Sequence, residues 1–498
     1  MVVRACDHCH WSKEKCSFDG DYQTCSRCRR LKIVCTISRG KRRVGRRPAA
    51  RSFPHGKMQI WSVEQQQRST PESSNHRGAI CTLSPRSKST SLLGMTEIGT
   101  CKEDIGNVPT VSPERLLAAP TNLRTISDAM HTIEDVEQFA VIHMPFMLGT
   151  NFTLDFRKAA YSILYLSAPI LTEGYLAFLG LMTGYQNSLV LHRDKPDMCK
   201  AAKGLQRLRG VTIMHDYDAA GALFLGQAMY VFNILTEANS STAHSIVRSS
   251  IISTQQWYPR LICNPAMDTV IVTPILLDTV ECLVRREVPL IRLVIPDRMI
   301  VDRYVGLCPT LLPHLYDICE RSHALKKAGL DTASEAQPGV HDWFTDIDQT
   351  IREWKPETPP RLFTEYGRHE ILIMVTQAKV YRLAALLVIH RLQYPFGVED
   401  YTATYLANSI FHEMFFFART AAKVSTALPV VFPLIVAMLE VEGPGEELME
   451  TLSSFTIQSI CAAKLQEFVK HIRAFRKSGF GGTWFGLVET HLNVAVIP

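Results

Sequence analysis

The sequence lacks any stretch that would export the chain or anchor it in a membrane. Met1 to Ala5 lead directly into Cys6, without the apolar segment of a secretory signal. The two strongest candidates for a membrane span, 174–192 and 424–439, are interrupted by polar residues, glycines or prolines. Neither resembles a spanning helix of about 20 apolar residues, so we expect buried core segments and no membrane partner. A chain that is not exported meets a reducing environment, where cysteines are thiols or metal ligands rather than disulfides.

Catalytic signatures are also missing. His412 and Glu413 begin like a metalloprotease helix, but Phe416 stands where the second histidine would be. The glycines around Pro444 are not followed by the Lys-Ser/Thr pair of a phosphate-binding loop, and the sequence contains no G-x-S-x-G motif. We therefore expect that the protein is not an enzyme.

Acidic residues are scarce at the N-terminal end. Residues 1–48 carry 13 Lys and Arg against four Asp and Glu, a net charge of +9, whereas the whole chain nets only +6. The other 450 residues therefore net −3. A strongly basic end on a nearly neutral body indicates a polyanion as partner, or else a basic tail without fixed structure.

The composition divides the chain into three regions. Residues 1–48 are rich in cysteine and basic residues, and 49–125 are rich in Ser, Thr, Pro, Gln and Gly without sustained periodicity, which predicts a disordered, flexible linker. Residues 126–498 are apolar and helical in pattern, and strand-type alternation is rare. The predicted fold class is therefore mainly α: a small cysteine module, a linker, and a large all-α domain of about a dozen helices.

Two helices of this domain can be predicted individually. The nearly continuous apolar run within 371–392 predicts a buried helix that ends before Pro395. The stretch 452–476 predicts an amphipathic surface helix. Its expected apolar face consists of Ile457, Ile460, Leu465, Phe468, Ile472 and Phe475, and its expected polar face of Lys464, Glu467, Lys470, Arg473 and Arg476.

The most specific motif is a set of six cysteines near the N-terminus. The cysteines are Cys6, Cys9, Cys16, Cys25, Cys28 and Cys35. They form two copies of the spacing C-x2-C-x6-C, separated by eight residues. A C-x2-C pair can place two thiolates on one metal ion, and the third cysteine of each copy can return to the cluster after about two helical turns.

Counting coordination positions predicts the metal content. Zinc prefers four tetrahedral ligands, so two ions need eight positions, which six thiolates fill only if two of them bridge. The internal repeat assigns the bridges to the first cysteine of each copy, Cys6 and Cys25. The alternative is one zinc ion in a C-x2-C-x15-C-x2-C site, which would leave Cys16 and Cys35 without a role. A module with so little apolar core would depend on metal binding to fold.

This pattern, with the basic residues around it, resembles the fungal Zn₂Cys₆ binuclear cluster family of transcription factors. The resemblance implies two zinc ions per chain, a nuclear protein, and binding to double-stranded promoter DNA at CGG-like sites in RNA polymerase II transcription. Stretches within 273–289, 381–392 and 432–434 are similar to the fungal-specific transcription factor domain, which implies a regulatory role for 126–498. The basic tail after the cysteines is similar to that of regulators of secondary-metabolite gene clusters.

The resemblance also assigns the DNA contacts. In this family a lysine three residues before the third cysteine reads guanine edges; here that residue is Lys13, with Lys15 close behind. His10 and Ser12 stand where the family usually has basic residues, which affects the expected half-site preference. The arginines and lysines of 39–48 would contact phosphates and could serve as a nuclear localisation signal. The predicted DNA-binding residues are His10, Lys13, Lys15, Arg29, Arg30, Lys32, Lys41, Arg42, Arg43, Arg46 and Arg47.

The predicted function is thus a sequence-specific transcription regulator, an activator of a secondary-metabolite biosynthetic gene cluster. The alternative is a zinc-module protein that acts mainly through protein–protein contacts, or a repressor. Expected partners are promoter DNA and the transcription machinery or co-regulators. Residues 49–80 contain no sustained heptads, so monomeric binding and a homodimer formed through the helical domain both remain open.

Overall fold

The structure is a computed structural model that describes residues 6, 9, 15–18, 24–36, 123–186, 196–236, 240–329, 343–420, 426–452 and 459–488. The chain divides into two compact units, Met1–Ser69 and Thr70–Pro498. The predicted boundary at residue 48 and nearly all of the predicted linker lie outside the described residues.

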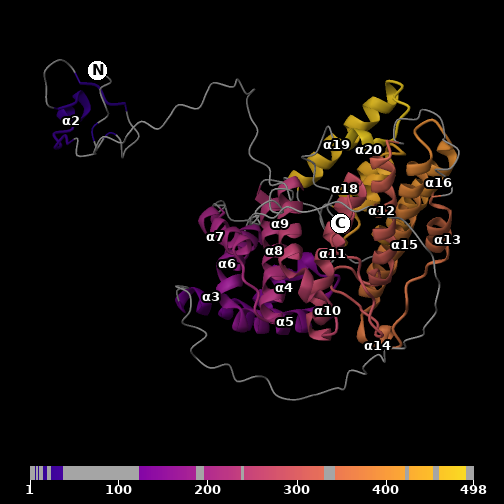
Figure 1. Cartoon of the computed structure of the whole chain (residues 1–498), viewed down its shortest axis with the longest axis horizontal. Coiled ribbons are helices and arrows are strands. Elements are labelled where there is room, and N and C mark those ends of the chain that lie inside the picture. Colours follow the sequence, from indigo (N-terminus) through magenta and orange to yellow (C-terminus); the bar gives the residue numbers. More distant parts are fainter. Residues whose placement is uncertain are drawn as a thin grey trace, which may run out of the picture. The chain divides into compact units, whose positions relative to one another are not determined.

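The second unit is built from helices (Figure 1). Within the described ranges there is no β-strand, and the backbone makes one isolated bridge, between Asp302 and Gly306. The predicted mainly α fold is therefore confirmed. The described part of this unit contains 18 α-helices instead of about a dozen. Several are too short for a periodicity analysis to detect, such as the four-residue helices α10 and α14.

The helices fall into an N-terminal and a C-terminal set. The N-terminal set comprises α3 (Leu123–Glu134), α4 (Val136–His143), α5 (Thr153–Leu166), α6 (Ala168–Gln186), α7 (Met198–Arg209), α8 (Asp216–Thr236), α9 (Ser240–Thr254), α10 (Tyr258–Leu261) and α11 (Asp268–Arg285). The C-terminal set comprises α12 (Leu312–Lys327), α13 (Thr345–Glu353), α14 (Leu362–Glu365), α15 (Arg368–Gln393), α16 (Asp400–Thr420), α17 (Val431–Met438), α18 (Pro444–Leu452), α19 (Ser459–Lys477) and α20 (Trp484–Val488). Short 3₁₀ turns join some of them: η3 (Met144–Phe146), η4 (Thr150–Phe152), η5 (Gln255–Trp257), η6 (Pro265–Met267) and η7 (Pro309–Leu311).

Helix α11 makes most of the contacts between the helices of the two sets. Helices α6 to α9 pack on one another, and α15, α16 and α17 form a second group. Helix α11 packs on α8 and α9 on one side and on α12 on the other (Figure 1). Its residues Asp268 to Val284 are all buried, including Asp278 and Glu281, because other helices pack around it. The buried side chains of both sets form one hydrophobic cluster.

Both individually predicted helices are present. Helix α15 ends at Gln393, before Pro395, and its residues 384–392 are continuously buried as expected. Helix α19 covers the described part of the second prediction and buries Leu465, Phe468 and Ile472. Two positions of α19 were predicted wrongly, because Arg473 is buried whereas Phe475 is 39% exposed. The guanidinium of Arg473 donates to the carbonyls of Met438 and Val441, which the helical period alone cannot reveal.

Two helices have the length and composition of a membrane span, and they are not the two stretches considered from the sequence. In α8 the apolar window is 89% buried within the fold, and in α15 it is 67% buried. Core helices of soluble proteins meet the same two criteria. Residues 426–439, expected to be core, are buried throughout, and α6 covers residues 174–186 of the other stretch.

Candidate metal centre

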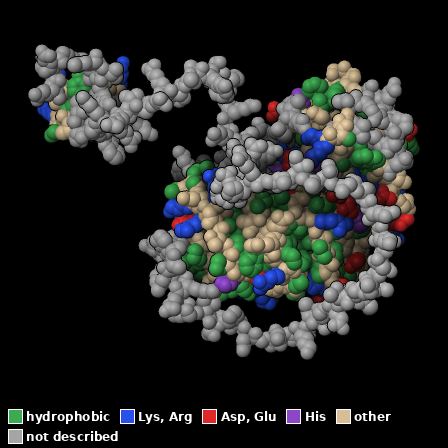
Figure 2. Space-filling model, in the orientation of Figure 1, with side chains coloured by type: hydrophobic (Ala, Val, Ile, Leu, Met, Phe, Trp, Pro, Cys, Tyr) green, Lys and Arg blue, Asp and Glu red, His purple; other side chains and the backbone are tan. Residues whose placement is uncertain are grey.

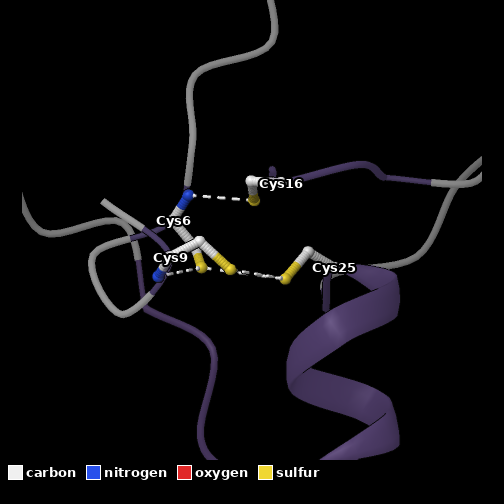
Figure 3. Close-up of side chains that lie close together, drawn as sticks. All are labelled: Cys6, Cys9, Cys16 and Cys25. Carbon is white, nitrogen blue, oxygen red and sulfur yellow. Dashed lines mark hydrogen bonds between the residues drawn. The ribbon is translucent and has the colours of Figure 1, made fainter. Parts of the chain in front are cut away.

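The six cysteines of the first unit come together in two groups of four. The sulfur atoms of Cys6, Cys9, Cys16 and Cys25 all lie within 4.8 Å of one another (Figure 3). Those of Cys6, Cys25, Cys28 and Cys35 form a second such group. Cys6 and Cys25 belong to both groups, and they are the two residues predicted to bridge. Cys9 and Cys28 never share a group, although the single-zinc alternative needs both on one ion.

The spacing of the sulfur atoms fits tetrahedral zinc. The Sγ atoms of Cys6 and Cys25 lie 3.7 Å apart, those of Cys6 and Cys28 3.6 Å, and those of Cys9 and Cys25 3.7 Å. Two sulfurs bound to one tetrahedral ion at about 2.3 Å would lie about 3.8 Å apart. The distances are far longer than a disulfide bond of about 2.05 Å. The six cysteines of the module are therefore close enough together to hold metal ions as thiolates.

Backbone amides orient the sulfurs in the same way in both halves. Cys9 donates its N–H to the Sγ of Cys6 at 3.4 Å, and Cys28 donates to Cys25 at 3.4 Å. The amide of Cys6 donates to Cys16 at 3.3 Å, and that of Cys25 to Cys35 at 3.4 Å. The internal repeat seen in the sequence is thus repeated in the hydrogen bonds. In the second half these bonds depend on helix α2 (Ser26–Arg30), for which Cys25 is the N-cap residue.

The electrostatics distinguish the shared cysteines from the others. Burial acts to raise the pKa of Cys25, but hydrogen bonds from Cys28 and neighbouring thiols lower it to about 6. At Cys6, burial likewise acts to raise the thiol pKa, but hydrogen bonds from Cys9 lower it below its usual value. At Cys16, burial raises the pKa to about 12. The shared sulfurs are therefore the ones most readily present as thiolates, the form that binds metal.

Two serines that were not predicted from the sequence, Ser17 and Ser26, connect the two halves of the module. The N–H and the hydroxyl of Ser26 both donate to the carbonyl oxygen of Ser17, at 2.9 and 2.8 Å. The two hydroxyl oxygens lie 2.9 Å apart. These bonds connect the segment after Cys16 to the start of α2. Each serine directly follows a cysteine of the motif, and this repetition was the signal that could have identified them.

Four of the predicted DNA-binding residues are described, and all four are exposed: Lys15, Arg29, Arg30 and Lys32. Figure 2 shows Lys and Arg side chains at the outside of this unit. Arg29 also donates to the carbonyl of Thr24 at 3.4 Å, within the same turn of chain. The remaining seven lie outside the described residues: His10, Lys13, Lys41, Arg42, Arg43, Arg46 and Arg47.

A third group of potential metal ligands lies in the helical unit. His244, Asp278 and Cys282 are buried on α9 and α11, and the His244 ring lies 2.8 Å from an Asp278 carboxylate oxygen. The guanidinium of Arg248 lies 3.4 Å from the same oxygen and 3.3 Å from the Cys282 sulfur. Because this cation already stands among the ligand atoms, we interpret the group as a buried ionic contact between helices.

Comparison with known proteins yields no relatives: no protein-family model, no curated protein and no solved structure matches the chain. The assignment of the site therefore depends on the spacing of the cysteines in the sequence and on the two sulfur groups. Together they define a cysteine cluster that can hold metal ions, compatible with a Zn₂Cys₆ module.

Proposed function

We propose that the chain is a sequence-specific DNA-binding transcription regulator whose N-terminal module holds two zinc ions. The observation that carries this proposal is the pair of four-sulfur groups that share Cys6 and Cys25. Two tetrahedral ions with two bridging thiolates need this arrangement of six cysteines. Zinc would supply the energy that folds the module, and the six thiolates would hold it.

The proposed DNA contacts follow from charge and exposure. Lys13 would read guanine O6 and N7 in the major groove, with His10 and Lys15 beside it. Exposed Arg29, Arg30 and Lys32 would neutralise phosphates. The tail would extend these phosphate contacts through Lys41, Arg42, Arg43, Arg46 and Arg47. Binding should therefore weaken steeply with salt.

The resemblance noted above supports the finer parts of the proposal. We assign the protein to the nucleus, to CGG-like promoter sites, and to activation of a secondary-metabolite gene cluster through RNA polymerase II. In this proposal the helical unit regulates and recruits co-regulators and does not catalyse a reaction. A homodimer formed through the helical unit would pair two half-sites on DNA.

A second candidate is a zinc module that acts through protein contacts. Leu31 is 47% exposed and Val34 is 83% exposed, directly after α2. Two exposed apolar residues close together on so small a module favour a partner protein. The non-basic residues at positions 10 and 12 favour the same reading.

Selection from a random pool of double-stranded DNA by the full-length, zinc-loaded protein separates the two candidates. We expect enrichment of a CGG-like half-site, lost after zinc chelation and in Lys13→Ala. Lys158→Ala is the matched control, because Lys158 is an exposed lysine on α5 of the other unit. If no sequence is enriched while two zinc ions per chain stay bound, base reading is rejected and the protein-contact candidate takes its place.

A further inference from the structure

The helical unit contains a cavity lined mainly by aromatic and aliphatic side chains. It encloses about 840 Å³ of space between atoms, including its mouth, of which about 100 Å³ is open to the centres of water-sized molecules. Rings of Phe146, Phe156, Phe178 and Phe224 form much of its wall, and Val231 lies among the half-buried residues at its edge. A mainly apolar lining with a few polar groups is typical of a small-molecule site.

One lining residue carries a permanent charge inside this apolar wall. Arg303 is only 4% exposed. Its guanidinium donates to the carbonyls of Thr269 at 2.9 Å and Phe146 at 2.7 Å, and to the side-chain oxygen of Gln227 at 2.8 Å. All three acceptors are neutral. A guanidinium has five N–H groups, so two of those on Arg303 remain for another acceptor.

The positive charge of Arg303 forms no ion pair with a described residue, although the adjacent Asp302 interacts with it electrostatically. No carboxylate oxygen of the described residues lies within 4.0 Å of the guanidinium. The neighbouring Asp302 accepts hydrogen bonds from the backbone of Tyr304 and Val305 instead, at 2.8 and 2.7 Å. Burial raises the pKa of Asp302, while the charge of Arg303 and these backbone hydrogen bonds act in the opposite direction.

None of the residues that line the cavity is acidic. Burial and the charge of Arg303 lower the pKa of His143 well below its usual range, so the imidazole is neutral and hydrogen-bonded to Tyr175 at 2.9 Å. The ring of Phe156 stacks on the guanidinium, 4.1 Å from ring centre to the central carbon. Stacking covers a face of the guanidinium and leaves its edge, where the N–H groups lie.

We propose that this cavity binds a small, largely apolar organic acid, whose carboxylate pairs with Arg303 while its hydrocarbon part packs against the phenylalanine rings. A buried guanidinium that has no ion-pair partner and two remaining N–H groups favours an anion with two acceptor oxygens. This inference goes beyond the proposed function and does not depend on DNA binding.

The experiment uses the full-length, zinc-loaded protein and two probes of equal shape, 4-ethylbenzoate and its neutral amide, 4-ethylbenzamide. Binding is measured by isothermal titration calorimetry and by the shift of the thermal unfolding midpoint. We expect the acid to bind and to raise the midpoint in proportion to its occupancy of the folded state. We expect the amide to bind at least about tenfold more weakly, because it carries no negative charge and offers one acceptor oxygen where the acid offers two.

Two substitutions place the binding in this cavity. Val231→Phe would fill the edge of the cavity while leaving Arg303 in place, and should abolish the shift caused by the acid. Val136→Phe is its matched control, since Val136 is 51% exposed on α4 and is not a lining residue, so the shift should persist. Arg303→Met should reduce acid binding to the level of the amide. If this variant does not fold, the comparison of Val231→Phe with Val136→Phe tests the proposal.

The same measurements can overturn the proposal. It fails if the acid neither releases heat nor shifts unfolding at millimolar concentration. It also fails if Val231→Phe and Val136→Phe respond alike, because the acid then binds elsewhere. Equal binding of acid and amide would reject the acid as the ligand class. The proposal is supported if the acid shifts unfolding of the wild type and of Val136→Phe but not of Val231→Phe.

Discussion

At the scale of single residues, the six cysteines of the module should not be equivalent. Cys25 belongs to both four-sulfur groups, whereas Cys35 belongs to one. Cys25→Ser should therefore reduce the zinc content from about two ions per chain to fewer than one, because each ion loses a ligand. Cys35→Ser should leave the other group complete and retain about one ion. Elemental analysis of the purified full-length variants measures both contents.

The same series tests the single-zinc alternative. In that arrangement Cys16 and Cys35 have no role, so Cys35→Ser would leave the zinc content unchanged. Cys199→Ser serves as the control, because Cys199 is an exposed thiol on α7 outside the module. Equal losses in Cys25→Ser and Cys35→Ser would contradict the sharing of Cys25 between two ions.

The ligands were predictable because metal coordination imposes a fixed spacing on the sequence, and the repeat then identified the shared residues. The positions of side chains whose partners are distant in sequence could not be predicted. Arg473 was expected at the surface but is buried, since its partners are the carbonyls of Met438, at the end of α17, and Val441, and the carboxylate of Glu446. The cysteines outside the module also differ in exposure, because Cys199 and Cys263 are exposed whereas Cys282, Cys308 and Cys319 are buried. Neither Cys199 nor Cys263 lies in a pattern that would have revealed this.

At the scale of helices, α6 and α7 approach closely where two glycines face each other. A Cβ atom added to Gly204 would lie 2.7 Å from the Cα of Gly174 and 3.1 Å from its nitrogen. Gly204→Ala must therefore push two backbones apart, and we expect a loss of about 1–3 kcal/mol in the free energy of unfolding. Urea unfolding followed by circular dichroism measures this loss.

Gly180→Ala is the matched control for this prediction. Gly180 is an exposed residue of α6, and an added Cβ would meet nothing within 4 Å. Alanine should there stabilise the helix by about 0.5–1 kcal/mol, since glycine loses more backbone freedom on folding. If the two variants changed stability in the same direction, the contact between α6 and α7 would not be the cause.

Helices differed in how well the sequence predicted them. Long apolar runs identified α15 and the buried segment that contains α17, because only core positions tolerate such runs. The period of 3.6 residues located α19. Helices of four or five residues, such as α14 and α20, are held by tertiary packing and carry no periodic signal.

At the scale of the whole molecule, the module and the helical unit have separate hydrophobic clusters. The cluster of the module consists of cysteine side chains with Phe18 and Ile33 beside them, and the helical unit buries its own core. Removal of zinc should therefore abolish DNA binding while the helical circular dichroism signal and the main unfolding midpoint of the full chain change little. Restoring zinc should restore binding.

A large drop in the main midpoint on chelation would contradict this independence. Buffer treated with a chelator already saturated with zinc is the control, because it keeps the ionic conditions and removes no metal. Composition anticipated the separation, since a segment of net charge +9 with six cysteines differs sharply from the remaining chain.

The sharing of Cys6 and Cys25 has a consequence for how the module responds to its surroundings. The first ion to bind would deprotonate and orient two sulfurs that the second ion also requires, so the second ion meets a partly formed site. Metal uptake should then be cooperative, with metal-free and doubly loaded chains in native mass spectra and few singly loaded ones. The module would then change from metal-free to fully loaded over a narrow range of free zinc concentration.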